Sequence, residues 1–218
     1  MNSRSLEPIA IADDFYLMAL DERTGRPRLH NRAMGLGLAA GLLCELVIDE
    51  RLTVKNDRLI ALVRPDGAGD PIHVRMLEHV HAEPDHDLAV WLSFFAQSAV
   101  DAVADRLVGL GYLTVEMTRG LLKSKPVYVP VDMVQVSWRS LRIEQVIARG
   151  SVPEWPECAL VGLLCATGLI EPILVNNVVD LNAHVAAILG ALVSDPPLHA
   201  LIFQVEALIA AGVLGSRK

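Results

Sequence analysis

Residues 35–63 read GLGLAAGLLCELVIDERLTVKNDRLIALV, and the rest of the chain is organised around this stretch. It opens with small residues and leucines up to Leu46, a composition that suits a helix packed closely on most sides. A polar turn follows at residues 49–51. Two short apolar runs, 52–54 and 59–63, then flank a Lys-Asn-Asp turn. The stretch predicts a buried helix followed by a two-stranded ribbon.

The same order of elements recurs in residues 99–131, AVDAVADRLVGLGYLTVEMTRGLLKSKPVYVPV. A helix is expected to end near residues 109–111, a strand to cover 112–115, and a second strand to lie near 127–131. Leu-Thr-Val opens the ribbon in both copies. Because two copies are too few for a solenoid, this repetition predicts only a second unit of a helix followed by a ribbon.

The composition indicates a helical protein. Of 218 residues, 52% are hydrophobic but only 5% are aromatic, so Ala, Leu and Val must build the core. This mix favours close-packed helices over a sheet sandwich, and helical patterns cover most of the C-terminal half. We therefore expect one mainly α-helical domain over residues 1–218, with a central helical bundle and short β-hairpins near 52–63 and 112–131.

The cysteines and the apolar runs bear on the compartment. No uninterrupted apolar run reaches the roughly 18–20 residues that span a bilayer. The first residues lack the basic start and apolar run of a signal peptide. Cys44, Cys158 and Cys165 sit in apolar helical patterns without a CxxC motif, which predicts reduced, buried thiols. We expect a cytoplasmic protein.

Several function classes are disfavoured. The formal charge of −7 counts against a general nucleic-acid binder. Helix-plus-ribbon units also occur in winged-helix proteins, so winged-helix nucleic-acid binding is an alternative function. However, a recognition helix carries several outward basic residues, and the helix expected at 88–108 offers only Arg106. We therefore expect no nucleic-acid partner.

No enzyme motif is present, since the chain lacks GxSxG, HExxH and Walker A patterns. Four of the seven histidines fall in residues 73–86. His79 and Glu83 are four apart and could face one metal on a helix, but Pro84 breaks that geometry. We expect neither an enzyme, nor a metal site, nor a cofactor.

The sequence predicts where charged residues lie in two of the expected helices. Asp13 is expected to cap a short helix that holds the apolar run up to Leu20. In the helix expected over 137–149, Leu141 is placed inward, and Arg139 and Arg142 outward.

Two segments are basic within this acidic chain. Residues 21–32 hold four arginines against two acids, a local charge of +2, although a solvated loop explains this as well. Residues 116–126 join the strands of the second ribbon. Basic residues flanking exposed leucines there suit insertion at an anionic membrane surface, with an ordinary solvated hairpin tip as the alternative. The candidate membrane-facing residues are Arg119, Leu121, Leu122, Lys123 and Lys125.

Four motifs, in order along the chain, resemble the Golgi phosphoprotein 3 family and its bacterial relatives. They are IADDFYLMAL at residues 11–20 with the Gly-Arg-Pro loop after it, LLCEL at 42–46, RLV at 106–108 leading to Gly-Tyr-Leu, and ALVGLLCATGL at 159–169. The resemblance implies a mainly helical domain with a protruding hairpin. It also implies peripheral binding to membranes bearing phosphatidylinositol 4-phosphate, as in eukaryotic members that hold glycosyltransferases in the Golgi.

The resemblance also implies a headgroup pocket. In the family, a tryptophan and an arginine around the first core helix and two arginines three apart on the helix before the hairpin form it. The matching positions here are His30, Ala39, Gln97 and Val100, and none retains the family residue. The loss of three arginines removes the charge-assisted contacts that hold a phosphate, so strong selectivity for this lipid is not expected.

The basic loop could supply phosphate contacts from a neighbouring place. Its candidate headgroup residues are Arg26, Arg28, His30 and Arg32. The sequence thus predicts a non-enzymatic, peripheral adaptor at the inner face of a membrane, with an anionic lipid and a protein as partners. The second hairpin could instead contact another subunit, which would make the protein a homo-oligomer. A soluble interaction module without lipid binding is the alternative function.

Overall fold

The computed structural model describes residues 9–64, 67, 69–118, 125–174 and 181–215. Within these ranges the chain forms nine helices and two separate two-stranded antiparallel sheets, which confirms the mainly α-helical fold. The helices are α1 (Ile11–Met18), α2 (Asn31–Ile48), α3 (Pro71–Ala82), α4 (Leu88–Gly109), α5 (Met133–Ala148), α6 (Trp155–Ala166), α7 (Ile170–Ile173), α8 (Leu181–Leu192) and α9 (Pro196–Gly215). The strands are β1 (Leu52–Lys55), β2 (Arg58–Ala61), β3 (Leu113–Thr118) and β4 (Lys125–Pro130).

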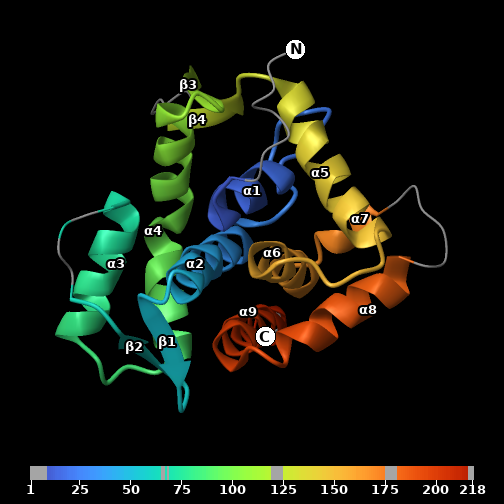
Figure 1. Ribbon diagram of the computed structural model, residues 1–218. Coiled ribbons are helices and arrows are strands. Elements are labelled where there is room, and N and C mark those ends of the chain that lie inside the picture. The colour runs from blue at the N-terminus through green and yellow to red at the C-terminus, as the bar shows by residue number, and fades with distance from the viewer. Residues whose placement is uncertain (1–8, 65–66, 68, 119–124, 175–180, 216–218) are drawn as a thin grey trace.

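Helix α2 is the centre of the fold, with α1, α4, α6 and α9 packed around it (Figure 1). Every residue from Ala33 to Leu46 is buried. Its glycines allow this close packing. A Cβ added at Gly35 would collide with the Ala96 carbonyl oxygen of α4, and one at Gly37 would collide with the Phe15 ring of α1. The small residues predicted for this helix are therefore required by its neighbours.

Both predicted hairpins are present, at opposite ends of α4 (Figure 1). The first turns through Asn56 and Asp57, whose positive φ angles of 51° and 61° suit a two-residue hairpin turn. The second pairs Leu113 with Pro130 at its base and Thr118 with Lys125 at its outer end. Each ribbon has only two strands, so its stability depends on packing against the helices.

Two helices are long and apolar enough to cross a membrane by length and composition alone, among the residues that the structure describes. They are α2, with 78% of the window buried inside the protein, and α4, with 39% buried. The search for an uninterrupted apolar run missed both helices, because each of them contains one or two charged residues within its apolar stretch. Since α2 is enclosed by other helices, its apolar character is accounted for by the core.

A buried charge cluster joins α1 to α2, α3 and α4. Asp13 accepts a 2.9 Å hydrogen bond from Arg106 Nε, and Arg106 Nη1 donates to Asp70 at 2.9 Å. Glu45 Oε2 lies 2.7 Å from His73 Nε2 and 3.8 Å from Arg106 Nη1. Burial is the main cause that raises the pKa of Asp13 to about 6, against the opposing effect of Arg106. The expectation that Asp13 caps α1 is wrong, because the helix begins earlier and turns this carboxylate inward.

A second cluster joins α1 to α5 and α6. Arg142 donates to Asp14 at 2.6 Å, Arg139 lies 3.1 Å from the other oxygen of Asp14, and Arg142 lies 3.5 Å from Glu157. Burial raises the pKa of Asp14 despite these arginines. The expected outward placement of Arg139 and Arg142 is wrong, as is the inward placement of Leu141, which is 44% exposed. A buried carboxylate on α1 makes it favourable for arginines to face the core.

The three thiols are free, with Cys44 and Cys158 buried and Cys165 partly buried. Burial raises the pKa of Cys158 and of Cys165 to about 11, and also raises that of Cys44. The thiolate is the reactive form of cysteine, so these side chains are chemically quiet at neutral pH.

Candidate functional site

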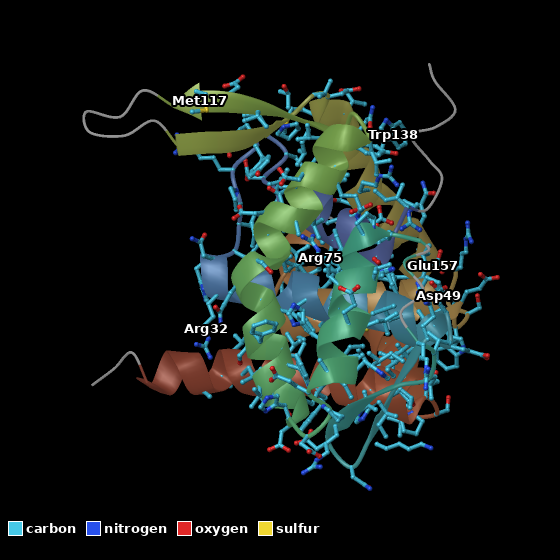
Figure 2. The ribbon with its side chains drawn as sticks, turned by 90° about the vertical axis from the view of Figure 1, so that its left-hand side faces the viewer. Arg32, Asp49, Arg75, Met117, Trp138 and Glu157 are labelled. Atoms are coloured by element: carbon cyan, nitrogen blue, oxygen red, sulfur yellow. The ribbon has the colours of Figure 1, made fainter. Side chains whose placement is uncertain are left out.

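The β3–β4 ribbon has one apolar face. Residues directly opposite each other in an antiparallel pair share a face, so the register places Leu113 with Pro130 and Val115 with Tyr128. We call these four residues and Met117 the apolar face of the β3–β4 ribbon. Its exposure rises away from the helices, from 2% at Leu113 to 44% at Val115 and 60% at Met117. Figure 2 shows Met117 on the part of the ribbon that projects from the body.

The base of this ribbon is held against α4 and α5. The Tyr128 hydroxyl donates a 2.9 Å hydrogen bond to Asp105 of α4. The Arg139 guanidinium of α5 lies 5.5 Å from the centre of the Tyr112 ring, which precedes β3. These contacts fix the direction in which the ribbon projects, so its apolar face is presented by a rigid support.

The basic loop between α1 and α2 is an ordered turn. Asp21 accepts hydrogen bonds from the backbone N–H and the hydroxyl of Thr24, both 2.8 Å long. The tip passes beside the base of the ribbon, since a Cβ added at Gly25 would lie 3.4 Å from Pro130. The loop and the second ribbon, far apart in sequence, therefore meet.

The four candidate headgroup residues of this loop have different surroundings. Arg26 is exposed beside the ribbon base. The Arg28 Nε group donates to the Leu20 carbonyl at 3.3 Å, and His30 Nδ1 accepts from the Ala33 N–H and caps α2. Arg32 is exposed on the first turn of α2, close to Gly212 of α9. These side chains are spread along the loop and the start of α2, and Arg32 adjoins a pocket.

A pocket of about 550 Å³ lies between the start of α2 and the middle of α4. We call it the Arg32 pocket. Its lining residues are Asn31, Arg32, Leu36, Ser93, Ala96, Gln97, Val100 and Asp101.

Two of the four positions matched to the family headgroup residues, Gln97 and Val100, line this pocket. Ala39, by contrast, is fully buried inside α2. Among the described lining residues, Arg32 is the only cation and Asp101 is a carboxylate. One guanidinium offset by one carboxylate makes a weak phosphate site, because phosphate recognition relies on several charge-assisted donors.

The outer part of the second hairpin is only partly described. Arg119, Leu121, Leu122 and Lys123 lie outside the described residues. Lys125 is the first residue of β4, and its backbone pairs with that of Thr118. The proposed contact of these residues with a membrane stays a prediction.

The histidine-rich segment is divided between two environments. His73 is buried against Glu45, whereas His79 is exposed and its ring packs edge-on against Phe94, with centroids 5.1 Å apart. Sequence reasoning missed the inner charge clusters altogether. The signal was available, because Asp13, Asp14 and Glu45 each interrupt an apolar run and a buried charge requires a partner.

A family model described as Golgi phosphoprotein 3 (GPP34) matches residues 11–208, from the first residue of α1 into α9. A search among curated proteins found no match.

Proposed function

The chain belongs to the Golgi phosphoprotein 3 (GPP34) family, and from this premise we propose that it is a peripheral, adaptor-type membrane protein. In this proposal it binds anionic lipid surfaces through the β3–β4 ribbon and the neighbouring basic loop. The supporting observation is the apolar face of the β3–β4 ribbon, which becomes more exposed along a strand pair that projects from the body. An exposed apolar strip on a rigid projection is costly in water and suited to the boundary of a bilayer.

The chemistry around the ribbon supports reversible binding. Three basic residues of the ribbon segment, Arg119, Lys123 and Lys125, accompany the leucines of its tip in sequence. Each basic residue close to an anionic surface contributes on the order of 1 kcal/mol. Burying the exposed parts of Val115 and Met117 adds about 1–3 kcal/mol together. These terms support transient membrane association and no permanent anchoring.

The Arg32 pocket argues against a selective phosphoinositide site. A phosphomonoester would meet a single guanidinium and would be repelled by the Asp101 carboxylate. We therefore propose that general surface charge drives binding, with no strong preference for phosphatidylinositol 4-phosphate among anionic lipids. Such binding weakens with salt, because the screening length is about 10 Å at 0.1 M.

Vesicle co-sedimentation tests the proposal with neutral, phosphatidylserine-containing and phosphoinositide-containing vesicles. Val115→Glu should abolish sedimentation with anionic vesicles. The matched control is Val90→Glu, a substitution at a similarly exposed valine at the far end of α4, where exposure is 49%. If both variants sediment like the unchanged protein, the ribbon is not the contact.

The alternative, a protein-interaction module without lipid binding, is favoured by a different observation. A pocket of about 340 Å³ between α3 and α4 is lined by Phe94 and Phe95, and Phe94 is 44% exposed. Absence of sedimentation with any vesicle at low salt would support this alternative. A winged-helix role is disfavoured, because α4 exposes Asp101 and Asp105 while its one arginine, Arg106, faces the inner charge cluster.

A further inference from the structure

Helices α3 and α4 run antiparallel and are held together at both ends of their contact. At one end, Arg106 Nη1 of α4 donates a 2.9 Å hydrogen bond to Asp70, the residue that caps α3. At the other end, the His79 ring of α3 packs edge-on against Phe94 of α4, with centroids 5.1 Å apart. Between these two contacts lies the pocket of about 340 Å³, which we call the α3–α4 pocket. Because both ends of the helix pair are fixed, the pocket is preformed.

Small side chains on α4 leave this space open. Ser98, Ala99 and Ala102 line the pocket at helical spacings of three and four, so they share the face of α4 that is turned to α3. Leu42 of α2 and Met76 of α3 are buried and also line the pocket, which makes its inner surface apolar. The volume lies near the lower end of the roughly 300–1,000 Å³ that small-molecule sites occupy, so it suits a ligand of about the size of one amino acid.

One end of the pocket is aromatic. Only 5% of the chain is aromatic, yet Trp91, Phe94 and Phe95 gather here. Trp91 stacks on Phe95 with centroids 5.2 Å apart, and Phe94 meets Phe95 edge to face at 5.4 Å. Phe94 and Phe95 both line the pocket, and Phe94 remains 44% exposed. The ring contacts hold these side chains in place, so they offer a fixed surface to an apolar or aromatic group.

Away from the rings, the pocket carries one cation and one carboxylate from opposite walls. Arg75 of α3 and Asp101 of α4 line it, and neither makes a hydrogen bond or an ion pair with another residue that the structure describes. Asp105 also lines it, but this carboxylate accepts the 2.9 Å hydrogen bond from Tyr128. Figure 2 faces this side of the molecule, with Arg75 on α3 next to α4. Arg75 and Asp101 are therefore both available to a ligand.

These features restrict the charges that a ligand can carry. A ligand with only a positive charge would be repelled by Arg75, and one with only a negative charge would be repelled by Asp101. A wholly apolar ligand would displace water from both charged groups and replace none of its hydrogen bonds. A ligand that joins a carboxylate and an ammonium group to an apolar body meets all three parts of the pocket. Its carboxylate would accept charge-assisted hydrogen bonds from the guanidinium, and its ammonium would donate to Asp101.

We propose that the α3–α4 pocket binds an apolar α-amino acid, with the carboxylate on Arg75, the ammonium on Asp101 and the side chain against Phe94. This inference goes beyond the proposed membrane function and does not depend on it, because the lining includes no residue of the β3–β4 ribbon or of the basic loop. The protein thus has a small-molecule site on a different face from its proposed lipid contact.

Methyl NMR of protein labelled at the methionine Cε groups tests the site directly. Met76 lines the pocket, whereas Met18 is buried in the core away from it, so Met18 is the internal control. Titration with L-phenylalanine should shift the Met76 signal and leave the Met18 signal in place, and Met76→Leu assigns the signal. 2-Phenylethylamine lacks the carboxylate and 3-phenylpropionate lacks the ammonium, so each should bind about tenfold more weakly or worse. If L-phenylalanine moves no Met76 signal, or if either analogue binds as tightly, the inference is wrong.

Two charge-neutralising variants identify the contacts. Arg75→Gln should remove the advantage of L-phenylalanine over 2-phenylethylamine, and Asp101→Asn should remove its advantage over 3-phenylpropionate. Arg64→Gln, at an exposed arginine that does not line the pocket, is the matched control and should change each affinity less than twofold. All three side chains are exposed, so the variants should stay folded, which circular dichroism checks. If either pocket variant keeps the full preference for L-phenylalanine, its charge does not hold the ligand and the inference is overturned.

Discussion

Arg142 donates a 2.6 Å hydrogen bond to Asp14 across 128 positions of the sequence. The next residue back, Asp13, binds Arg106 of a different helix. Two consecutive aspartates on one short helix therefore reach α5 on one side and α4 on the other. Helix α1 therefore connects α4 and α5 through buried ion pairs, and the first two predictions test these ion pairs.

Replacing Asp14 should strongly destabilise the protein. Asp14→Ala leaves the buried Arg139 and the partly buried Arg142 without their shared carboxylate, and breaking a buried ion pair in this way costs about 3–5 kcal/mol. Urea unfolding followed by circular dichroism measures the change. Arg149→Ala, at an exposed arginine of the same region, is the control and should change stability by less than about 0.5 kcal/mol. Equal effects of the two variants would contradict a stabilising role for the Asp14 ion pairs.

The second prediction concerns pH. The folded-state pKa of Asp13 is raised from 3.8 to about 6, so the folded protein holds a proton there that the unfolded chain has lost. This group's contribution to stability is complete below pH 3.8 and is lost as the pH rises through 6. Between pH 5 and pH 7 the loss amounts to about 1 kcal/mol.

Asp13→Asn should flatten that part of the stability profile, because the amide does not titrate. Urea midpoints at half-unit pH steps give the measurement. Arg106, Asp14 and Glu45 act electrostatically on Asp13 and are present in both proteins. A variant whose midpoints fall between pH 5 and 7 as steeply as before would show that Asp13 is not the titrating group.

The third prediction concerns the glycine contacts of α2. Gly35→Ala should destabilise the protein by about 1–3 kcal/mol, because the added methyl group meets the Ala96 backbone oxygen and one of the two helices must move. Gly109→Ala provides the comparison on α4, where the added Cβ meets no atom within 4 Å. Thermal unfolding should show a loss for the first variant and none for the second. A neutral Gly35→Ala would mean that the α2–α4 contact is looser than described.

The fourth prediction concerns lipid selectivity. Gln97→Arg adds a second guanidinium to the Arg32 pocket, so it should increase the preference for vesicles with phosphatidylinositol 4-phosphate over phosphatidylserine vesicles of equal charge. Ser98→Arg, the neighbouring exposed position, does not line that pocket and should strengthen binding to both vesicles alike. Co-sedimentation at several salt concentrations separates the two cases. An unchanged preference in the Gln97 variant would mean that this pocket does not face the headgroups.

The fifth prediction concerns the tip of the second hairpin. The double change Leu121→Ser, Leu122→Ser removes apolar surface that we expect to enter the acyl boundary, while Arg119, Lys123 and Lys125 remain. Vesicle binding should be lost, and the molecular mass in solution should stay the same. Dissociation of an oligomer, or intact vesicle binding, would assign the hairpin to contacts between subunits instead.

The sequence by itself determined the local elements. Residues 35–63 specified a buried helix and a ribbon because small residues, apolar runs and an Asn-Asp turn act over neighbouring positions. Low aromatic content and helical periodicity were enough for the mainly α-helical class. The order of weak motifs pointed to the family, which the match over residues 11–208 shows.

Only the tertiary structure decided which charged residues face inward and which surfaces lie together. Arg139 and Leu141 exchanged their expected sides because Asp14, more than a hundred residues away, lies within the core beside α5. Arg32 shares a pocket with Gln97 and lies beside Gly212, because α2, α4 and α9 meet only after the chain has folded. A periodic pattern records which face of a helix is apolar, but the partner that a buried charge requires is supplied by another helix, and the local sequence does not identify that helix.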